Sequence, residues 1–292
     1  MKCRIKRRRL SAGNAAIYAF LILCSLLTLY PLWHCVIGSI TTFEEYIRKP
    51  FLLWPETPTF DAYEYVFTQG RIFSPMIITI VTTLVGTPIN LFMQSYMAYG
   101  LSRPFPGNGL VTGIVVLTMF LNPGLIPLYL LYQQLGILNS IWVYILPCMI
   151  NSFYLIILRT HFSSLPKELI ESSRLDGCSE FGAFFRIALP LSLPVMASIG
   201  LFTAVDFWNT YSQSVYFVTD ASKKTLQNYL YLFLSGNSAN ISGGGINMMI
   251  GNVFSENTKL ANTVLSILPI IAIYPFTQRY FVKGMLLGAV KG

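Results

Sequence analysis

One acidic side chain lies deep inside an otherwise apolar segment. If the run 191–211 is a helix that begins near Leu191, a rise of about 1.5 Å per residue places Asp206 about 22 Å across a hydrocarbon core of about 30 Å. Burying a lone carboxylate there costs several kcal/mol, so Asp206 should face a cavity or a partner. Trp208 and Asn209 stand beside it, and an aromatic face next to carboxylate and amide groups suits a sugar ring. The alternative is an interfacial aromatic belt in which Asp206 caps the helix end.

Three further polar residues occur within apolar runs, namely Asn122, Asn151 and Tyr154. Each could offer hydrogen bonds along the same substrate pathway. Hydrogen bonding between helices is the commoner role of such residues in membranes, and it is the alternative for all three.

The sequence lacks the patterns of a metal site or of a nucleotide-hydrolysing enzyme. His34 and His161 are far apart and belong to no His-Glu-x-x-His helix, and the five cysteines show no Cys-x-x-Cys spacing. A Gly-rich phosphate loop is also missing. We therefore expect no metal, no cofactor and no catalytic residue in this chain.

Composition predicts an integral membrane protein. Hydrophobic residues make up 54% of the 292 residues and charged residues only 11%, and the mean hydropathy is +0.58. Apolar runs of about 20 residues are long enough to cross a bilayer as helices, and a helix satisfies its backbone polar groups within lipid. Six such runs predict an all-α fold with six transmembrane helices: 15–40, 73–101, 110–132, 141–158, 191–211 and 260–278.

The distribution of basic residues predicts the orientation of these helices. Most of the 20 Lys and Arg residues fall in the amino-terminal segment, in the loop 160–190 and near the carboxyl end. Basic loops stay in the cytoplasm, so both termini and the loop 160–190 should be cytoplasmic. A net charge of +8 is explained by this juxtamembrane bias and does not require a nucleic-acid partner.

Proline and loop composition add two expectations. Prolines should interrupt the third run at Pro123 and Pro127, the fourth at Pro147, and the sixth at Pro269 and Pro275. On the outer face, the long connections 41–72 and 211–259 could receive an external protein, and the second of them carries a helical apolar stripe at Leu226, Tyr229, Leu230 and Phe233.

The cytoplasmic loop between the fourth and fifth helices reads as a helix, a turn and a second helix. Pro166 opens the first helix, Gly177 permits the turn, and Phe181, Phe184 and Phe185 begin a second apolar face. A fully solvated surface helix has no need of this aromatic cluster. We expect the loop to insert into a cleft of another protein, with Glu171 available for a salt bridge.

The same loop resembles the "EAA" loop of permease subunits of ATP-binding cassette (ABC) importers, whose pattern is Glu-Ala-Ala, a Gly, and then Ile-x-Leu-Pro. Here Glu171 is followed by Ser172 and Ser173 in place of the two alanines, and Ile187 and Leu189-Pro190 complete the pattern. The resemblance implies that an ATPase subunit contacts this loop through the residues Glu171, Ser172, Ser173, Arg174, Asp176, Gly177 and Phe181.

Two further segments resemble the carbohydrate-importer branch, in particular its shorter, maltose-permease-like subunit. These are the segment that runs from Pro127-Leu128-Tyr129 through 135–139 to Leu146-Pro147, and the carboxyl-terminal segment 278–292. In that branch the tail reaches between the two ATPase subunits, which implies this role for Gly288, Lys291 and Gly292. The resemblance leans toward permeases for alginate and pectin fragments.

The resemblance implies a division of labour among several proteins. A binding protein outside delivers a sugar or oligosaccharide to a pathway formed by this chain and a second, homologous permease, and two ATPase subunits that hold ATP and Mg drive transport. The chain would then comprise a basic segment 1–14, a transmembrane domain 15–282 and a cytoplasmic tail 283–292 in a bacterial cytoplasmic (inner) membrane. The alternative is a secondary carrier or channel driven by an ion gradient, which would explain the broken helices and Asp206 but not the cytoplasmic loop.

Overall fold

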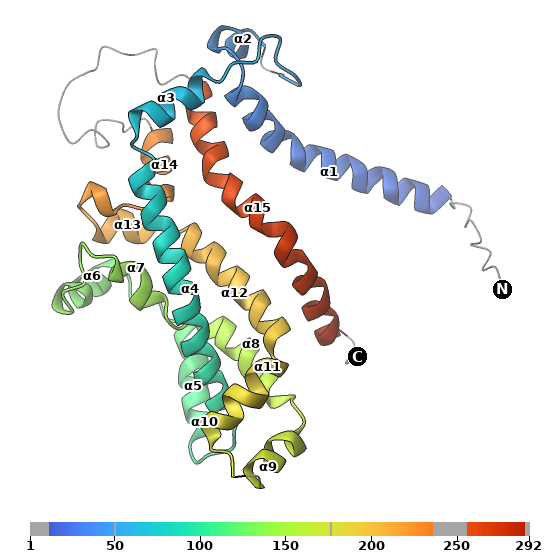
Figure 1. Cartoon of the computed structure of the whole chain (residues 1–292), viewed down its shortest axis with the longest axis vertical. Helices are drawn as coiled ribbons and strands as arrows, with labels where there is room; N and C mark the ends of the chain where they lie inside the picture. Colours follow the sequence, from blue (N-terminus) through green and yellow to red (C-terminus); the bar gives the residue numbers. More distant parts are fainter. Residues whose placement is uncertain (1–11, 50, 176, 236–255, 290–292) are drawn as a thin grey trace. The chain divides into compact units, whose positions relative to one another are not determined.

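The computed structural model describes residues 12–49, 51–175, 177–235 and 256–289, and all of their regular secondary structure is helical. Figure 1 shows the elements in chain order. They are α1 (Ala12–Ser39), α2 (Phe43–Arg48), α3 (Asp61–Gln69), α4 (Phe73–Leu101), α5 (Asn108–Thr118), α6 (Leu125–Gln134), α7 (Trp142–Ile145), η1 (Leu146–Cys148), α8 (Ser152–Ser163), α9 (Lys167–Leu175), α10 (Glu180–Ala183), η2 (Phe184–Ala188), α11 (Leu189–Leu191), α12 (Leu193–Trp208), α13 (Ser212–Phe217), η3 (Ala221–Lys223), α14 (Leu226–Leu234) and α15 (Glu256–Ala289).

Among the described residues, two helices, α1 and α4, are continuous, long and apolar enough to cross a membrane. The count rises to four when two bent pairs are each taken as one span: α7–η1 with α8, bent by 45°, and α10–α11 with α12, bent by 82°. The expected all-helical membrane architecture is therefore confirmed, while the count of six spans stays a prediction.

Two of the three expected proline interruptions occur. The third run is divided into α5 and α6, with Gly124 at a left-handed φ of 81° between them, and Pro147 lies in η1 just before the bend that leads into α8. The third expectation is wrong, because α15 continues as one helix through Pro269 and Pro275. A proline removes a single backbone hydrogen bond, and membrane helices can absorb that loss without a break.

The chain divides into two compact units. The first contains α1, α2, α3 and the beginning of α15 as far as residue 265. Within it the buried Asn257 side chain donates to the carbonyl oxygens of Gly38 (2.8 Å) and Thr41 (2.6 Å), which satisfies carbonyls at the end of α1. The buried Glu45 accepts the backbone N–H of Glu56 at 2.8 Å, so α2 is joined to the loop that follows it.

The second unit, residues 70–245 and 266–292, is organised around α4, which packs most extensively against α12 and α8. Small and polar residues of α4 are buried: Thr79, Thr82, Gly86, Asn90 and Gln94. Large apolar residues such as Leu84 and Phe92 are exposed on the other side. This arrangement is typical of a helix in lipid, where close packing and hydrogen bonds rather than apolar burial hold neighbouring helices together.

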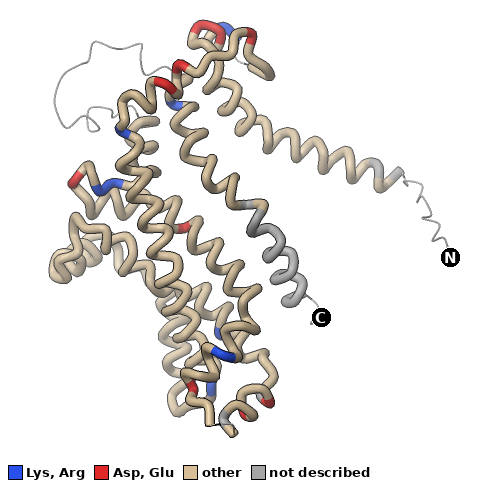
Figure 2. The backbone as a smooth tube through the Cα atoms, in the orientation of Figure 1, with Lys and Arg blue, Asp and Glu red and all other residues tan. Residues whose placement is uncertain are grey.

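Glycine permits the closest approach between α4 and α12. A Cβ atom at Gly86 would lie 2.6 Å from Cζ of Phe207, so only glycine leaves room for that ring. Figure 2 shows that most of the charged residues of this unit lie toward the ends of its helices, and α4 itself carries none.

Candidate functional site: a polar cavity and an exposed helix

A cavity of about 400 Å³ lies between α4, the η1–α8 bend, α12 and α13. Its lining combines an apolar wall, which includes Phe207, Ile150 and Pro147, with several polar side chains. The polar members are Asn90, Asn151, Tyr154, Thr203, Asp206, Thr210 and Gln213. Three of the side chains expected from the sequence to line a substrate pathway, Asp206, Asn151 and Tyr154, are therefore brought together here.

Asp206 is held by a hydrogen bond from a neighbouring helix. The phenol of Tyr154 donates to Oδ2 of Asp206 at 2.9 Å, and the Tyr154 ring stacks on Phe202 with centroids 6.1 Å apart and planes inclined by 13°. The carboxylate inside the apolar run thus faces a cavity and a hydrogen-bond donor. Asp206 lies in the last turn of α12, but the residue that caps this helix end is Asn209, so Asp206 is not the capping residue.

The bend before α8 places Asn151 and Tyr154 at this cavity. Asn151 has an extended backbone and caps α8, because its Oδ1 accepts the backbone N–H groups of Phe153 (3.0 Å) and Tyr154 (3.3 Å). Pro147 precedes this cap in η1. The cap starts a new helix whose first turn presents Tyr154 to the cavity.

A buried polar network beside the cavity escaped the sequence analysis. Asn90 on α4 donates to the carbonyl of Cys148 and accepts from Gln94, and Thr203 on α12 donates to Asn90 Oδ1 at 3.4 Å. Asn90 and Gln94 are four residues apart, so they share one helix face with Gly86. That polar stripe in an apolar span is the signal that could have revealed them.

Three other candidates take structural roles away from the cavity lining. The indole of Trp208, 6% exposed, donates to the carbonyl of Ser266 at 3.1 Å. Asn209 ends α12 and accepts from Gln227 at 3.3 Å. Asn122 accepts the backbone N–H of Gly124 at 3.0 Å in the break between α5 and α6.

The loop 160–190 folds as its sequence predicts, with α9, a turn and then α10. Gly177 adopts a φ of 78°, and the Cys178 N–H donates to the Ser173 carbonyl at 2.9 Å, which closes α9 with a left-handed glycine cap. Ser179 then caps α10 by accepting from the N–H of Gly182. Asp176 lies outside the described residues, as does the side chain of Arg174.

Helix α9 has one face against the protein and one face open. Ile170 is 2% exposed and Ser173 is buried, whereas Glu171 and Ser172 are exposed and Leu175 is 89% exposed. The two serines that replace alanine satisfy their hydroxyls inside the helix, because Ser172 donates to the Leu169 carbonyl (3.1 Å) and Ser173 to the Ile170 carbonyl (2.8 Å). Ser173 therefore packs as a small residue with no unmet donor.

Aromatic residues fix this loop to the ends of α4 and α8. Phe184 is fully buried, with its ring 5.5 Å from that of Tyr96 and 5.3 Å from that of Tyr99. Phe181 contacts the edge of Tyr96 at 6.0 Å and packs on Phe185 at 4.6 Å. The aromatic cluster thus packs against the chain's own core as well as lying at its surface. Of the expected tail contacts, Gly288 lies in α15, and Lys291 and Gly292 lie outside the described residues.

Comparison with known proteins identifies the class to which this arrangement belongs. Residues 70–287 match the family model of the binding-protein-dependent transport system inner membrane component. The chain belongs to this family. The permease is similar to the polygalacturonan/rhamnogalacturonan transport system permease protein YtcP of Bacillus subtilis, with 41% identity over 94% of this chain and 97% of that protein.

Two solved structures share the fold. The permease superposes with a TM-score of 0.83 on a chain of a bacterial ABC transporter involved in the import of the acidic polysaccharide alginate, at 26% identity and over 96% and 99% of the two chains. A second chain, from a bacterial alginate ABC transporter in complex with an alginate pentasaccharide-bound periplasmic protein, has a TM-score of 0.60 at 16% identity over 91% and 93% of the two chains.

Family membership confirms several expectations from the sequence. The permease is a non-catalytic, multi-pass component of the inner membrane and a subunit of an ABC importer. Within its described residues, no group of three or more His, Cys, Asp or Glu side chains could hold a metal. An importer permease is supported over the carrier driven by an ion gradient.

Proposed function

We propose that this permease forms half of the translocation pathway for an oligosaccharide, paired with a second homologous permease, two ATPase subunits and an external binding protein. The relative at 41% identity is named for polygalacturonan and rhamnogalacturonan, and the structural match at 26% identity is a component of an alginate importer. Both names support a saccharide, and the alginate of the structural match is described as an acidic polysaccharide.

The cavity around Asp206 supports a polyhydroxylated substrate. Its volume of about 400 Å³ falls in the usual range of small-molecule sites, about 300–1,000 Å³. Asp206, Asn151 and Gln213 can accept or donate hydrogen bonds to hydroxyl groups, and Phe207 and Ile150 offer apolar surface to the C–H face of a ring.

The open face of α9 is the observation that carries the coupling role. Leu175 exposes 89% of its surface, a large value for a leucine beside exposed Glu171, and a surface of this kind calls for a protein partner. With the loop 160–190 in the cytoplasm, that partner is an ATPase subunit. Closure of two ATPases on ATP would pull α9 and move the attached helices, so that the cavity changes the side to which it opens. Gly288, Lys291 and Gly292 would add a second contact between the ATPases.

The test is ATP turnover by the reconstituted transporter with its binding protein and saccharide. Glu171→Lys should abolish saccharide-stimulated ATP turnover, because it reverses the charge on the proposed contact face. Glu64→Lys makes the same change at an exposed position of α3, in the connection expected outside the cell, and should leave turnover intact. Unchanged stimulation in Glu171→Lys would remove the coupling role from α9.

A further inference from the structure

A second cavity, of about 270 Å³, opens where the beginning of α4 meets η3 and α14. Its charged lining residues are basic, whereas the charged residue of the first cavity, Asp206, is acidic. The polar lining residues are Arg71, Ser74, Ser222, Lys224, Asn228 and Tyr229. In the orientation proposed above, this cavity lies on the extracytoplasmic side of the permease, because α4 ends toward the cytoplasm.

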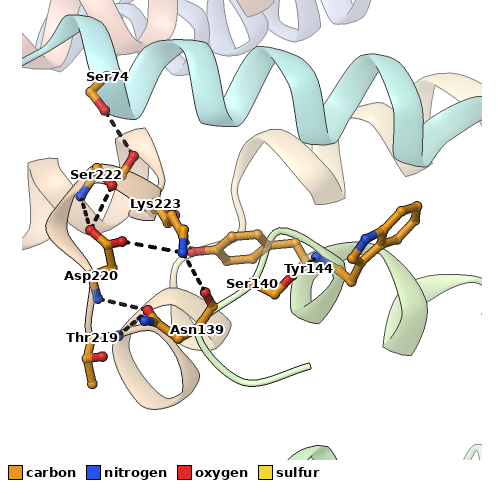
Figure 3. A network of polar contacts seen from close by, with 9 residues as sticks. Ser74, Asn139, Ser140, Tyr144, Thr219, Asp220, Ser222 and Lys223 are labelled. Carbon is orange, nitrogen blue, oxygen red and sulfur yellow. Dashed lines mark hydrogen bonds and ion pairs between the residues drawn. The ribbon is translucent and has the colours of Figure 1, made fainter. Parts of the chain in front are cut away.

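The wall of this basic cavity is fixed to α4. Ser74 donates a 3.0 Å hydrogen bond to the carbonyl of Ser222, and the Asp220 carboxylate accepts both the N–H (3.0 Å) and the hydroxyl (2.7 Å) of Ser222 (Figure 3). The loop that carries Lys224 is therefore held in one position beside the beginning of α4.

Asn139 fixes the same loop from the other side (Figure 3). Its backbone has a φ of 56°, and its Oδ1 accepts the N–H groups of Thr219 (3.2 Å) and Asp220 (2.9 Å). Lys223 donates to the Asn139 carbonyl at 3.1 Å and lies 3.4 Å from Asp220. Adjacent lysines thus have different roles, because Lys223 stabilises the loop while Lys224 lines the cavity.

The chemistry of the lining selects an anion that also carries a hydroxyl group. Arg71 and Lys224 bring two positive charges, and none of the described residues that line the cavity is acidic. Asn228 is 1% exposed, and its Oδ1 receives no hydrogen bond among the described residues, so it leaves an acceptor open to a molecule in the cavity that carries a donor. Inorganic phosphate offers mainly acceptors at neutral pH and satisfies this need poorly. A sugar acid has both a carboxylate and hydroxyl donors.

We propose that this basic cavity binds the carboxylate of a uronic-acid unit in an acidic oligosaccharide. This inference rests on the proposed transport function and specifies its substrate class. Arg71 and Lys224 would bind the carboxylate, Asn228 would accept a ring hydroxyl, and Tyr229 and Pro75 would supply apolar surface. The pathway cavity holds a carboxylate of its own in Asp206, so recognition of the acidic group in this chain is assigned to the outer cavity.

The experiment measures uptake by the complete reconstituted transporter with two probes, trigalacturonate and its methyl ester. Lys224→Gln should raise the KM for trigalacturonate about fivefold, the size expected for one partly exposed ion pair, and should leave the KM for the ester unchanged. Lys259→Gln is the matched control, because Lys259 pairs with Glu256 at 2.7 Å and is not part of the cavity lining. It should alter neither value.

Several results would overturn the proposal. One is a KM that Lys224→Gln changes equally for trigalacturonate and its methyl ester, or changes for neither. Another is a wild-type transporter that imports neutral oligosaccharides but not trigalacturonate. If Lys224→Gln instead raises the Kd between the transporter and the saccharide-free binding protein, the cavity accepts an acidic side chain of that protein. Failure of the transport function itself would be recognised separately, as absence of saccharide-stimulated ATP turnover in the wild type.

Discussion

Tyr154 of α8 donates a 2.9 Å hydrogen bond to Asp206 of α12, and both side chains line the same cavity. The two residues are far apart in the sequence and come from separate helices. The hydrogen bond satisfies one carboxylate oxygen and leaves the remaining acceptor positions of Asp206 available to a ligand.

Replacing Asp206 tests the role of this cavity in transport. Asp206→Asn should raise the KM for saccharide uptake about tenfold, because hydrogen bonds to a charged acceptor are worth about 1.5–3 kcal/mol and the neutral amide forms weaker ones. In the double variant with Tyr154→Phe, the free-energy change calculated from KM should not exceed the sum of the changes in the two single variants, since both substitutions disturb the same hydrogen bond. Uptake rates across a saccharide series would supply the values. An unchanged KM in Asp206→Asn would remove the carboxylate from the pathway.

Gly86 tests the packing between α4 and α12. Gly86→Ala should destabilise the permease by about 1–3 kcal/mol, because its methyl group would lie 2.6 Å from the Phe207 ring. Gly113→Ala in α5 is the control, since nothing lies within 4 Å of its position. The unfolding temperature in detergent should fall for Gly86→Ala only, and equal values for the two variants would contradict the close approach.

Helix α9 allows surface and core effects to be separated. Leu175→Ser should reduce retention of the ATPase subunits during purification while leaving the unfolding temperature unchanged, because Leu175 is exposed. Ile170→Ser on the buried face should lower the unfolding temperature, since it places a hydroxyl in an apolar environment. If both variants retain the ATPase subunits as well as the wild type does, α9 is not the contact.

Asp220 should make the outer loop sensitive to acid. Hydrogen bonds from Ser222 and the nearby Lys223 ammonium lower the pKa of Asp220 below its ordinary value of about 4. The stabilisation is therefore present above pH 4 and is lost as the pH falls through the lower, folded-state pKa. Hydrogen exchange at the Ser222 amide, corrected for its intrinsic rate, should accelerate below pH 4. Asp220→Asn should abolish this pH dependence, and its persistence in that variant would point to another group.

Local signals explain what the sequence could reveal. Pro166 and Gly177 predicted α9 and its turn because helix starts and left-handed glycines depend on neighbouring residues only. Asp206 was recognisable because a carboxylate inside an apolar run is costly wherever its neighbours lie.

Contacts between distant segments explain what remained hidden. Tyr154 gains its role from Asp206 and Asn90 from Thr203, and neither pairing has a sequence signature. Trp208 was grouped with Asp206 by proximity in the sequence, but residues two apart on a helix point about 200° from each other, and the Trp208 indole donates to the Ser266 carbonyl instead. The continuous helix through Pro269 shows that proline indicates a possible break without requiring one.

The 82° bend just before Leu193 joins α10, η2 and α11 directly to α12. Asp206 lies thirteen residues farther along, about 20 Å from that joint at 1.5 Å per residue. A swing of only about 10° in a stiff rod of this length displaces its far part by about 3 Å, roughly the span of one hydrogen bond. If α9 is the ATPase contact proposed above, a small rotation at this joint would be enough to separate Asp206 from Tyr154.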